Sequence, residues 1–296
     1  MLYELIDSLS GEFAVSTLCS VLGASRTAYY RYQRGGSYRP TTRREEKRLL
    51  VEKVFGEHKR RYGSRRITAE LRAQGHEVGR HQVRSLMKAS GLRPIQPKSF
   101  VPRTTDSTHG KGYWPNLLLD QPPPTAPDQV WVSDITYIPL VGGGWCYLAS
   151  WMDLFTRRIV GWRVDENMED ALVLIPLRSA LRTRHPAAGL IVHSDRGGQY
   201  VSGELRELVS LWKIRPSMSR ADDPYDNAFA ESFWSRLKAE MLEGGAFLDV
   251  QDAKVEIFEY IEAYYNRVRR HSSLGYQSPE QFEKQYYQKT ASKVCR

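Results

Sequence analysis

The pattern of apolar and polar positions changes near residue 128, and it divides the chain into a helical half and a half rich in strands. Beyond residue 128, short runs of β-branched and aromatic residues recur, which is typical of strands. The runs that we predict to be strands cover residues 130–138, 145–153, 158–164, 190–195 and 214–218. Helical patterns over 171–184 and 203–211 lie between the later strands. We therefore expect an α/β domain with a mixed sheet flanked by helices.

A first helical segment, residues 13–34, has the pattern of a helix-turn-helix. Gly23 marks the turn, and Ser25 can cap the second helix. That helix carries Arg26 and Arg31, whose side chains suit phosphates and base edges. We expect these two arginines to contact DNA.

A second helical segment follows a link that contains Gly35, Gly36 and Pro40. Its helices are predicted over residues 43–59, 64–73 and 81–90, with Ser64 as a cap of the second. Leu49 and Val54 lie on the apolar face of the first helix, and Ile67 and Val83 belong to the expected small core. The basic side chains left for DNA include Arg65, Arg66 and Arg84.

Proline divides the chain. Eight of the 15 prolines fall within residues 93–127, which predicts a linker. The expected divisions are a helix-turn-helix segment at 1–35, a second basic helical domain at 36–92, the linker at 93–127, the α/β domain at 128–242 and a C-terminal helical extension at 243–296.

A helix that follows Pro224 carries two stripes. Asn227, Glu231, Trp234 and Lys238 fall on one stripe at helical spacing. An apolar stripe lies beside it, formed by Phe229, Phe233 and Leu237. A carboxylate and an ammonium group two turns apart therefore share a face that also meets the core.

The last predicted helix, 249–270, is amphipathic and has a basic end. We expect Val255, Phe258, Ile261 and Tyr265 to point inward. The basic end comprises Arg267, Arg269, Arg270 and His271, and we expect it to contact DNA. His271 could alternatively act as a general base.

Charge strengthens the case for a nucleic-acid partner. The chain has a formal net charge of +9, and residues 26–103 alone carry 21 Lys and Arg against 6 Asp and Glu. Such a block indicates a polyanion, most simply double-stranded DNA. The three cysteines are too few and too scattered for a disulfide framework or a zinc site, and no apolar run approaches the roughly 18 residues of a membrane span. We expect a cytoplasmic protein with no membrane partner.

Three acids complete the prediction. The element order resembles that of a ribonuclease H-like domain, in which the strand that contains Asp134 neighbours the strand that Asp195 ends, so that Glu231 can close over both. Carboxylates about 4 Å apart repel by on the order of 4 kcal/mol per pair at an effective dielectric near 20. Oxygen ligands without cysteine favour Mg²⁺ or Mn²⁺. We expect two such ions to bridge a scissile phosphate, with Lys238 beside them.

The spacing of these acids resembles the DDE core of retroviral integrases and insertion-sequence transposases. Sixty residues separate Asp134 from Asp195, and 35 separate Asp195 from Glu231. The local motifs resemble the OrfB-type transposases of the IS-three family: Trp131-x-x-Asp134-Ile135-Thr136-Tyr137, His193-Ser194-Asp195-x-Gly197-x-Gln199-Tyr200, Asp226-Asn227-Ala228-x-Ala230-Glu231-Ser232-Phe233 and Tyr265-Asn266-x-x-Arg269-x-His271-x-x-Leu274-Gly275.

The resemblance implies an enzyme that binds terminal inverted repeats, cleaves a 3′ end and transfers that end to target DNA by transesterification. It also implies a homo-oligomer, at least a dimer, and a chain that acts alone or as the downstream half of a frameshift fusion. One departure is Ala221-Asp222-Asp223-Pro224, where relatives commonly have Gly-Asn. Two alternatives stay open, namely a DNA-binding regulator whose core no longer cuts and a nuclease on the same fold.

Overall fold

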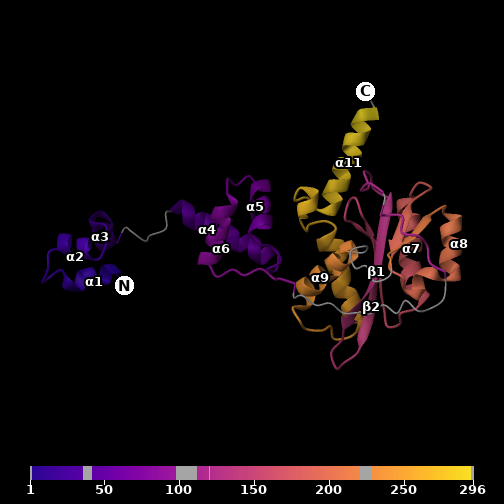
Figure 1. Cartoon of the computed structure of the whole chain (residues 1–296), viewed down its shortest axis with the longest axis horizontal. Helices are drawn as coiled ribbons and strands as arrows, with labels where there is room; N and C mark the ends of the chain where they lie inside the picture. The colour runs from indigo at the N-terminus through magenta and orange to yellow at the C-terminus, as the bar shows by residue number, and fades with distance from the viewer. Residues whose placement is uncertain (1, 36–41, 98–111, 120, 221–227, 295–296) are drawn as a thin grey trace. The chain divides into compact units, whose positions relative to one another are not determined.

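The chain folds into two compact units, Met1–Arg93 and Pro94–Arg296. The computed structural model describes residues 2–35, 42–97, 112–119, 121–220 and 228–294. Figure 1 shows the helices of the first unit and the sheet of the second. No helix in these described ranges combines the length and apolar character that crossing a membrane requires.

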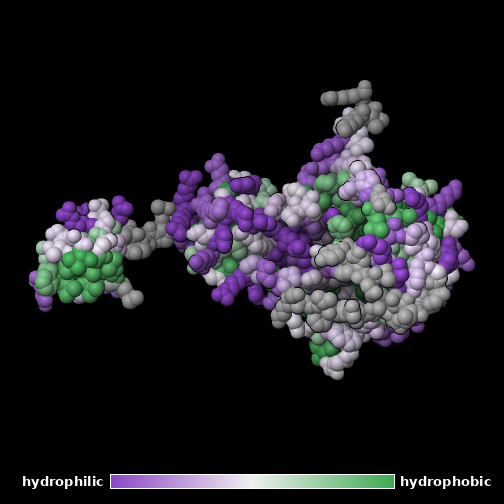
Figure 2. All heavy atoms as spheres, viewed as in Figure 1, coloured by the Kyte–Doolittle hydropathy of each residue, from purple (hydrophilic) through white to green (hydrophobic). Residues whose placement is uncertain are grey.

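Three short helices begin the first unit: α1 (Leu2–Leu9), α2 (Val15–Val21) and α3 (Arg26–Gln33). Ile6, Leu18, Cys19 and Tyr29 form their small core. The Ser25 hydroxyl accepts a hydrogen bond from the Ala28 amide and caps α3. The predicted helix pair and its cap are confirmed, and α1 adds a third helix that packs on the pair. Apolar side chains also gather on the surface of this bundle, as Figure 2 shows in green: Leu2, Leu5, Phe13 and Val21.

Three longer helices complete the first unit: α4 (Thr42–Glu57), α5 (Ser64–Ala73) and α6 (Arg80–Ala89). Val54, Ile67 and Val83 are buried, as the apolar pattern predicts. Two details of the prediction are wrong. Leu49 is exposed, and Gly63 rather than Ser64 takes the capping position of α5, with no side-chain cap.

A five-stranded sheet forms the centre of the second unit. Its strands are β1 (Val130–Pro139), β2 (Trp145–Asp153), β3 (Ile159–Asp165), β4 (Ile191–Ser194) and β5 (Arg215–Met218). Their order is β3-β2-β1-β4-β5, with β1–β2 and β2–β3 antiparallel, and β1–β4 and β4–β5 parallel. The predicted mixed sheet of a ribonuclease H-like domain is confirmed, including the pairing of the two strands that bring the aspartates together.

Helices cover both faces of this sheet (Figure 1). α7 (Asp170–Arg184) and α8 (Gly203–Leu211) bury one face, together with Trp131. α9 (Ala228–Leu242) and α10 (Val250–Phe258) bury the other, together with Val130 and Val132. Successive residues of a strand point to opposite faces, so Asp134 points to the same face as Val132, the face that α9 covers.

The C-terminal residues belong to this same core. After α10 the chain continues as a π-helical segment, Glu259–Tyr265, and it ends with α11 (Pro279–Val294). Ile261 and Tyr265 point inward as predicted, but Val255 and Phe258 are exposed. The buried residues of α10 are instead Ala253 and Ile257. At about 100° per residue Val255 lies on the opposite side of the helix from Ala253, so the prediction chose the wrong side of α10 as the inward face.

Phe229 at the start of α9 also departs from the prediction. The ring is exposed rather than part of the apolar stripe, and the guanidinium of Arg157 lies 4.1 Å from its centroid. Phe233 and Leu237 of the same stripe are buried as predicted.

The end of the proline-rich segment packs on the sheet unit. Leu117 and Leu118 pack on the hydrophobic cluster beneath α9, and the Leu117 amide donates a hydrogen bond of 2.9 Å to the hydroxyl of Ser217. This part of the expected linker is therefore ordered against β5.

Candidate active site

Asp134 lies in the middle of β1, half-buried beneath α9. One carboxylate oxygen, Oδ2, accepts a hydrogen bond of 3.1 Å from Nε1 of Trp234. The other, Oδ1, accepts one of 2.8 Å from the Ile135 amide. The strand and α9 together fix the direction of this carboxylate.

Asp195 follows β4 directly. Because β1 and β4 are parallel and Val132 pairs with His193, Asp134 and Asp195 lie at the same level of neighbouring strands. The amide of Gly197 donates a hydrogen bond of 3.1 Å to Oδ1 of Asp195. A Cβ atom at Gly197 would lie 3.2 Å from this oxygen, so the absence of a side chain at residue 197 leaves room for the carboxylate.

Glu231 lies in the first turn of α9, where it is exposed. Trp234 and Lys238 follow on the same stripe, at the spacings that the sequence predicts. Asn227, also assigned to this stripe, lies outside the described residues, so its place remains a prediction.

The electrostatics join these residues into one neighbourhood. Burial raises the pKa of Asp134 well above its ordinary value, and the negative charges of Asp195 and Glu231 raise it further. The side chain of Glu231 is exposed, but its carboxylate is partly removed from water, which also raises its pKa. Burial lowers the pKa of Lys238, while the charge of Asp134 acts in the opposite direction. Each acid is therefore close enough to influence the protonation of Asp134.

The chemistry of this donor set fits a divalent cation. The three side chains offer only carboxylate oxygens, which suit Mg²⁺ and Mn²⁺, and a cation would relieve the repulsion that raises the pKa of Asp134. Within the described part of the chain, no three His, Cys, Asp or Glu side chains are close enough together to hold a metal ion. The acids thus share an electrostatic field without standing at coordinating distance.

The arginines predicted to contact DNA differ in exposure. Arg26, Arg31, Arg65 and Arg84 are exposed on the helices of the first unit. Arg66 is half-buried, and its guanidinium lies 5.7 Å from the ring centroid of Tyr62. Exposure leaves the first four available to phosphates.

The basic C-terminal end is more buried than predicted. Arg270 is half-buried and donates a hydrogen bond of 2.8 Å to the carbonyl of Tyr276. His271 is also half-buried, with its ring 4.8 Å from that of Tyr265. Their assignment to DNA stays a prediction.

The assignment of Arg269 to DNA is wrong. Its side chain is only 1% exposed and pairs with Glu240 of α9, with Nη2 2.5 Å from Oε1. A guanidinium enclosed in this way has no face to offer to a phosphate.

Two residues near the acids were missed by sequence reasoning. Trp234 is the hydrogen-bond donor to Asp134, although the sequence placed it only on the stripe. Arg196 follows Asp195 and is half-buried, with Nε donating to the carbonyl of Ser219 and its guanidinium 4.7 Å from the centroid of Tyr113. The sequence could have indicated Arg196, because it directly follows Asp195, a candidate metal ligand.

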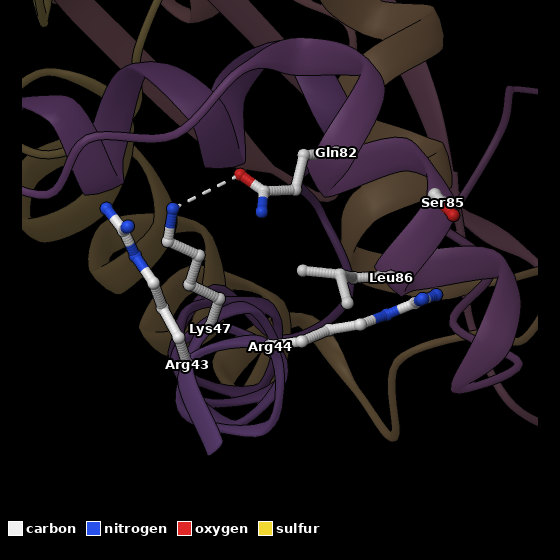
Figure 3. Close-up of a pocket in the computed structure, with 6 residues that line it drawn as sticks. All are labelled: Arg43, Arg44, Lys47, Gln82, Ser85 and Leu86. Atoms are coloured by element: carbon white, nitrogen blue, oxygen red, sulfur yellow. Dashed lines mark hydrogen bonds between the residues drawn. The ribbon is translucent and has the colours of Figure 1, made fainter. Parts of the chain in front are cut away.

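A basic cleft between α4 and α6 was also missed. Arg43, Arg44 and Lys47 of α4 and Gln82 and Ser85 of α6 line a cavity of about 600 Å³. Figure 3 shows these side chains, with Lys47 directed at Gln82. Nζ of Lys47 donates to the carbonyl of Glu77 at 2.8 Å and lies 3.4 Å from Oε1 of Gln82. Two arginines and a lysine at one opening form a positively charged surface within the second group of helices.

Family models match segments of both units of the chain. The family described as "HTH-like domain" matches residues 42–100, and two families described as "Integrase core domain" match residues 124–224 and 212–279. The catalytic core domain of HTLV-2 integrase in complex with magnesium resembles the chain with a TM-score of 0.40 and 14% identity, over 54% of this chain and 98% of that one.

Relatives match nearly the whole sequence. "Insertion element IS600 uncharacterized 31 kDa protein" of Shigella sonnei is 42% identical over 93% of this chain and 100% of the relative's length. "Transposase InsF for insertion sequence IS3A" of Escherichia coli (strain K12) is 37% identical over 96% of this chain and 98% of its own length. The chain therefore belongs to the IS-three family of insertion-sequence transposases.

Proposed function

We propose that this protein is a DNA transposase that binds the terminal inverted repeats of its element, cleaves the 3′ ends and joins them to target DNA by transesterification. The observation that carries the proposal is that parallel pairing of β1 and β4 and the charge of Glu231 place Asp134, Asp195 and Glu231 together within the two matched integrase core segments. Neither a DNA-binding regulator nor a structural protein requires three carboxylates placed so that two of them raise the pKa of the third.

The three acids would hold two divalent ions, Mg²⁺ or Mn²⁺. When bound, such ions activate the attacking oxygen and stabilise the charge on the leaving 3′-oxygen. The residues of the chain position this chemistry. Trp234 fixes the direction of the Asp134 carboxylate, Gly197 leaves room for that of Asp195, and Lys238 supplies a positive charge for a phosphate beside the acids.

The first unit supplies the DNA-binding surface. Arg26, Arg31, Arg65 and Arg84 are exposed there, and the basic cleft adds Arg43 and Arg44. Phosphate contacts by such side chains set the affinity, and contacts of base edges with one helix would select the terminal repeats.

Joining two ends of one element requires at least two active sites, so the working form is a homo-oligomer, at least a dimer. Its partners are the terminal repeats and the target DNA, with the chain acting alone or as part of a frameshift fusion. The cytoplasm is the compartment in which it would meet the host chromosome.

The test uses labelled DNA that carries the ends of the element, with Mg²⁺, and compares the wild type with Glu231→Gln. Glu256→Gln serves as the matched control, because Glu256 is an exposed glutamate on α10. Strand-joined product from the wild type and the control, absent with Glu231→Gln, supports the proposal. Hydrolysis without joining would instead identify a nuclease, and binding without cleavage would identify a regulator.

A further inference from the structure

A buried ion pair ties the end of α9 to the C-terminal segment. Nε of Arg269 donates to Oε2 of Glu240 at 2.9 Å, and Nη2 donates to Oε1 at 2.5 Å. The hydroxyl of Tyr260 donates to Oε2 of the same carboxylate at 2.9 Å. Arg269 is 1% exposed and Glu240 9% exposed, so three donors hold one carboxylate away from solvent.

The ion pair lies on the opposite side of α9 from the candidate active site. Glu240 lies nine positions after Glu231, and at about 100° per residue the two side chains point in nearly opposite directions. Phe233, one turn after Phe229, packs on the ring of Tyr265, with centroids 4.9 Å apart. One side of α9 therefore contacts the C-terminal segment, while Trp234 contacts Asp134.

The segment that carries Arg269 is itself fixed to the sheet. The side chain of Asn266 accepts a hydrogen bond from the Ile159 amide and donates one to the Ile159 carbonyl, both of 3.0 Å. Its backbone carbonyl accepts a hydrogen bond of 2.9 Å from the amide of Glu280. A continuous set of contacts thus runs from β3 through Asn266 and Arg269 to Glu240.

A buried ion pair is a poor source of net stability, because burying the two charges costs about as much as their attraction returns. The ion pair constrains geometry more than it adds stability, because the two parallel N–H groups of a guanidinium donate to a carboxylate only within a narrow range of orientations. Apolar contacts alone allow a helix to rotate or shift slightly while its area stays buried. The two hydrogen bonds from Arg269 to Glu240 oppose both the rotation and the shift of α9.

From this geometry we infer that Glu240 and Arg269 are positioning residues, which fix the rotation and axial position of α9 and thereby the places of Glu231 and Lys238 over Asp134. The inference rests on the proposed function for its catalytic consequence. Neither residue touches the reacting atoms, and Arg269 does not bind DNA.

The test compares Arg269→Lys and Glu240→Gln with Glu283→Gln. Arg269→Lys keeps the charge but loses the two parallel N–H groups. Glu283→Gln is the matched control, because Glu283 is a buried acid of the same unit that pairs with Arg158 and Arg184 rather than with α9. Three quantities are measured well below each melting temperature: the single-turnover cleavage rate at saturating DNA, the affinity for DNA, and hydrogen exchange of the α9 amides, Ala228–Leu242.

We expect both variants to lower the saturating cleavage rate about tenfold or more, with DNA affinity changed less than about twofold. Exchange of the α9 amides beyond its first turn, which are hydrogen-bonded within the helix, should accelerate in both variants and remain unchanged in Glu283→Gln. The double variant should be no worse than the worse single variant, because both remove one interaction.

Weaker DNA affinity at an unchanged saturating rate would overturn the inference and restore Arg269 as a DNA contact. Cleavage rates and exchange equal to those of Glu283→Gln would show that the ion pair contributes only to the stability of the fold, and this would also overturn the inference. If the wild type does not cleave at all, the proposed function fails, and the exchange measurement alone still decides whether the ion pair positions α9.

Discussion

The indole of Trp234 donates a hydrogen bond of 3.1 Å to the carboxylate of Asp134, across 100 positions of the sequence. This contact joins the covering helix α9 to the central strand β1 at the residue whose pKa is raised by burial and by the charges of both other acids. Because Glu231 and Lys238 lie on the same stripe of α9, the indole also locates that stripe over the strand.

Trp234→Phe should lower the cleavage rate about tenfold or more and leave DNA affinity nearly unchanged. A hydrogen bond to a charged group contributes about 1.5–3 kcal/mol, and each 1.36 kcal/mol corresponds to a factor of ten in rate. Trp162→Phe is the matched control, since Trp162 also donates to a carboxylate, that of Glu262, at 2.8 Å. Equal rate losses in both variants would argue against a role for the Asp134 contact.

Asp134→Asn should stabilise the metal-free protein at neutral pH. The folded pKa of Asp134 lies above the unfolded value, about 3.9, so the folded chain binds more protons and stability falls as pH rises through the interval between the two values. In chelator at pH 7.5 the melting temperature should rise by about 2 °C or more, and this gain should shrink as the pH approaches 4.

The control for this measurement is Asp165→Asn. Despite partial burial, hydrogen bonds from Arg163 lower the pKa of Asp165, so its loss should lower the melting temperature at neutral pH. An Asp134→Asn variant that melts below the wild type at pH 7.5 would show that the acids do not repel one another in the folded chain.

Gly197→Ala should slow cleavage about tenfold without preventing folding. The added methyl group would lie 3.2 Å from Oδ1 of Asp195, and displacement of a reacting group by a fraction of an ångström is costly to rate. Gly203→Ala is the control, because a Cβ there meets no heavy atom within 4 Å. Unchanged cleavage by Gly197→Ala would show that the Asp195 carboxylate tolerates displacement.

Arg44→Ala should weaken binding to DNA of any sequence by roughly threefold or more, and it should reduce the slope of log affinity against log salt by about one. Arg44 lines the basic cleft. Lys53→Ala is the control on the same helix, because Lys53 is exposed and has an ion-pair partner in Glu57 at 3.8 Å. Equal losses of affinity from the two variants would assign the effect to net charge rather than to the cleft.

The sheet and the three acids could be predicted because their signals are local. Strand-forming runs end at Asp195 or enclose Asp134, and helical spacing places Glu231 with Lys238. The order of strands in a ribonuclease H-like sheet then brings Asp134 and Asp195 together, because β1 and β4 are neighbours.

The C-terminal segment could not be predicted in the same way. The role of Arg269 depends on Glu240, 29 positions earlier in the sequence, and nothing in the local pattern distinguishes a buried arginine from one that binds DNA. Val255 and Phe258 are exposed because α10 packs on the core through the side that carries Ala253 and Ile257, and apolar residues on both sides of the helix left that choice open in the sequence.

The central claim is tested most directly by cleavage and strand joining on the element's own ends, measured with Mg²⁺ for Asp134→Asn, Asp195→Asn and Glu231→Gln beside Glu256→Gln. Each of the three should lose at least roughly 10³ in rate while it still binds DNA, and the control should match the wild type. Near-normal joining by any one of the three variants would contradict the account.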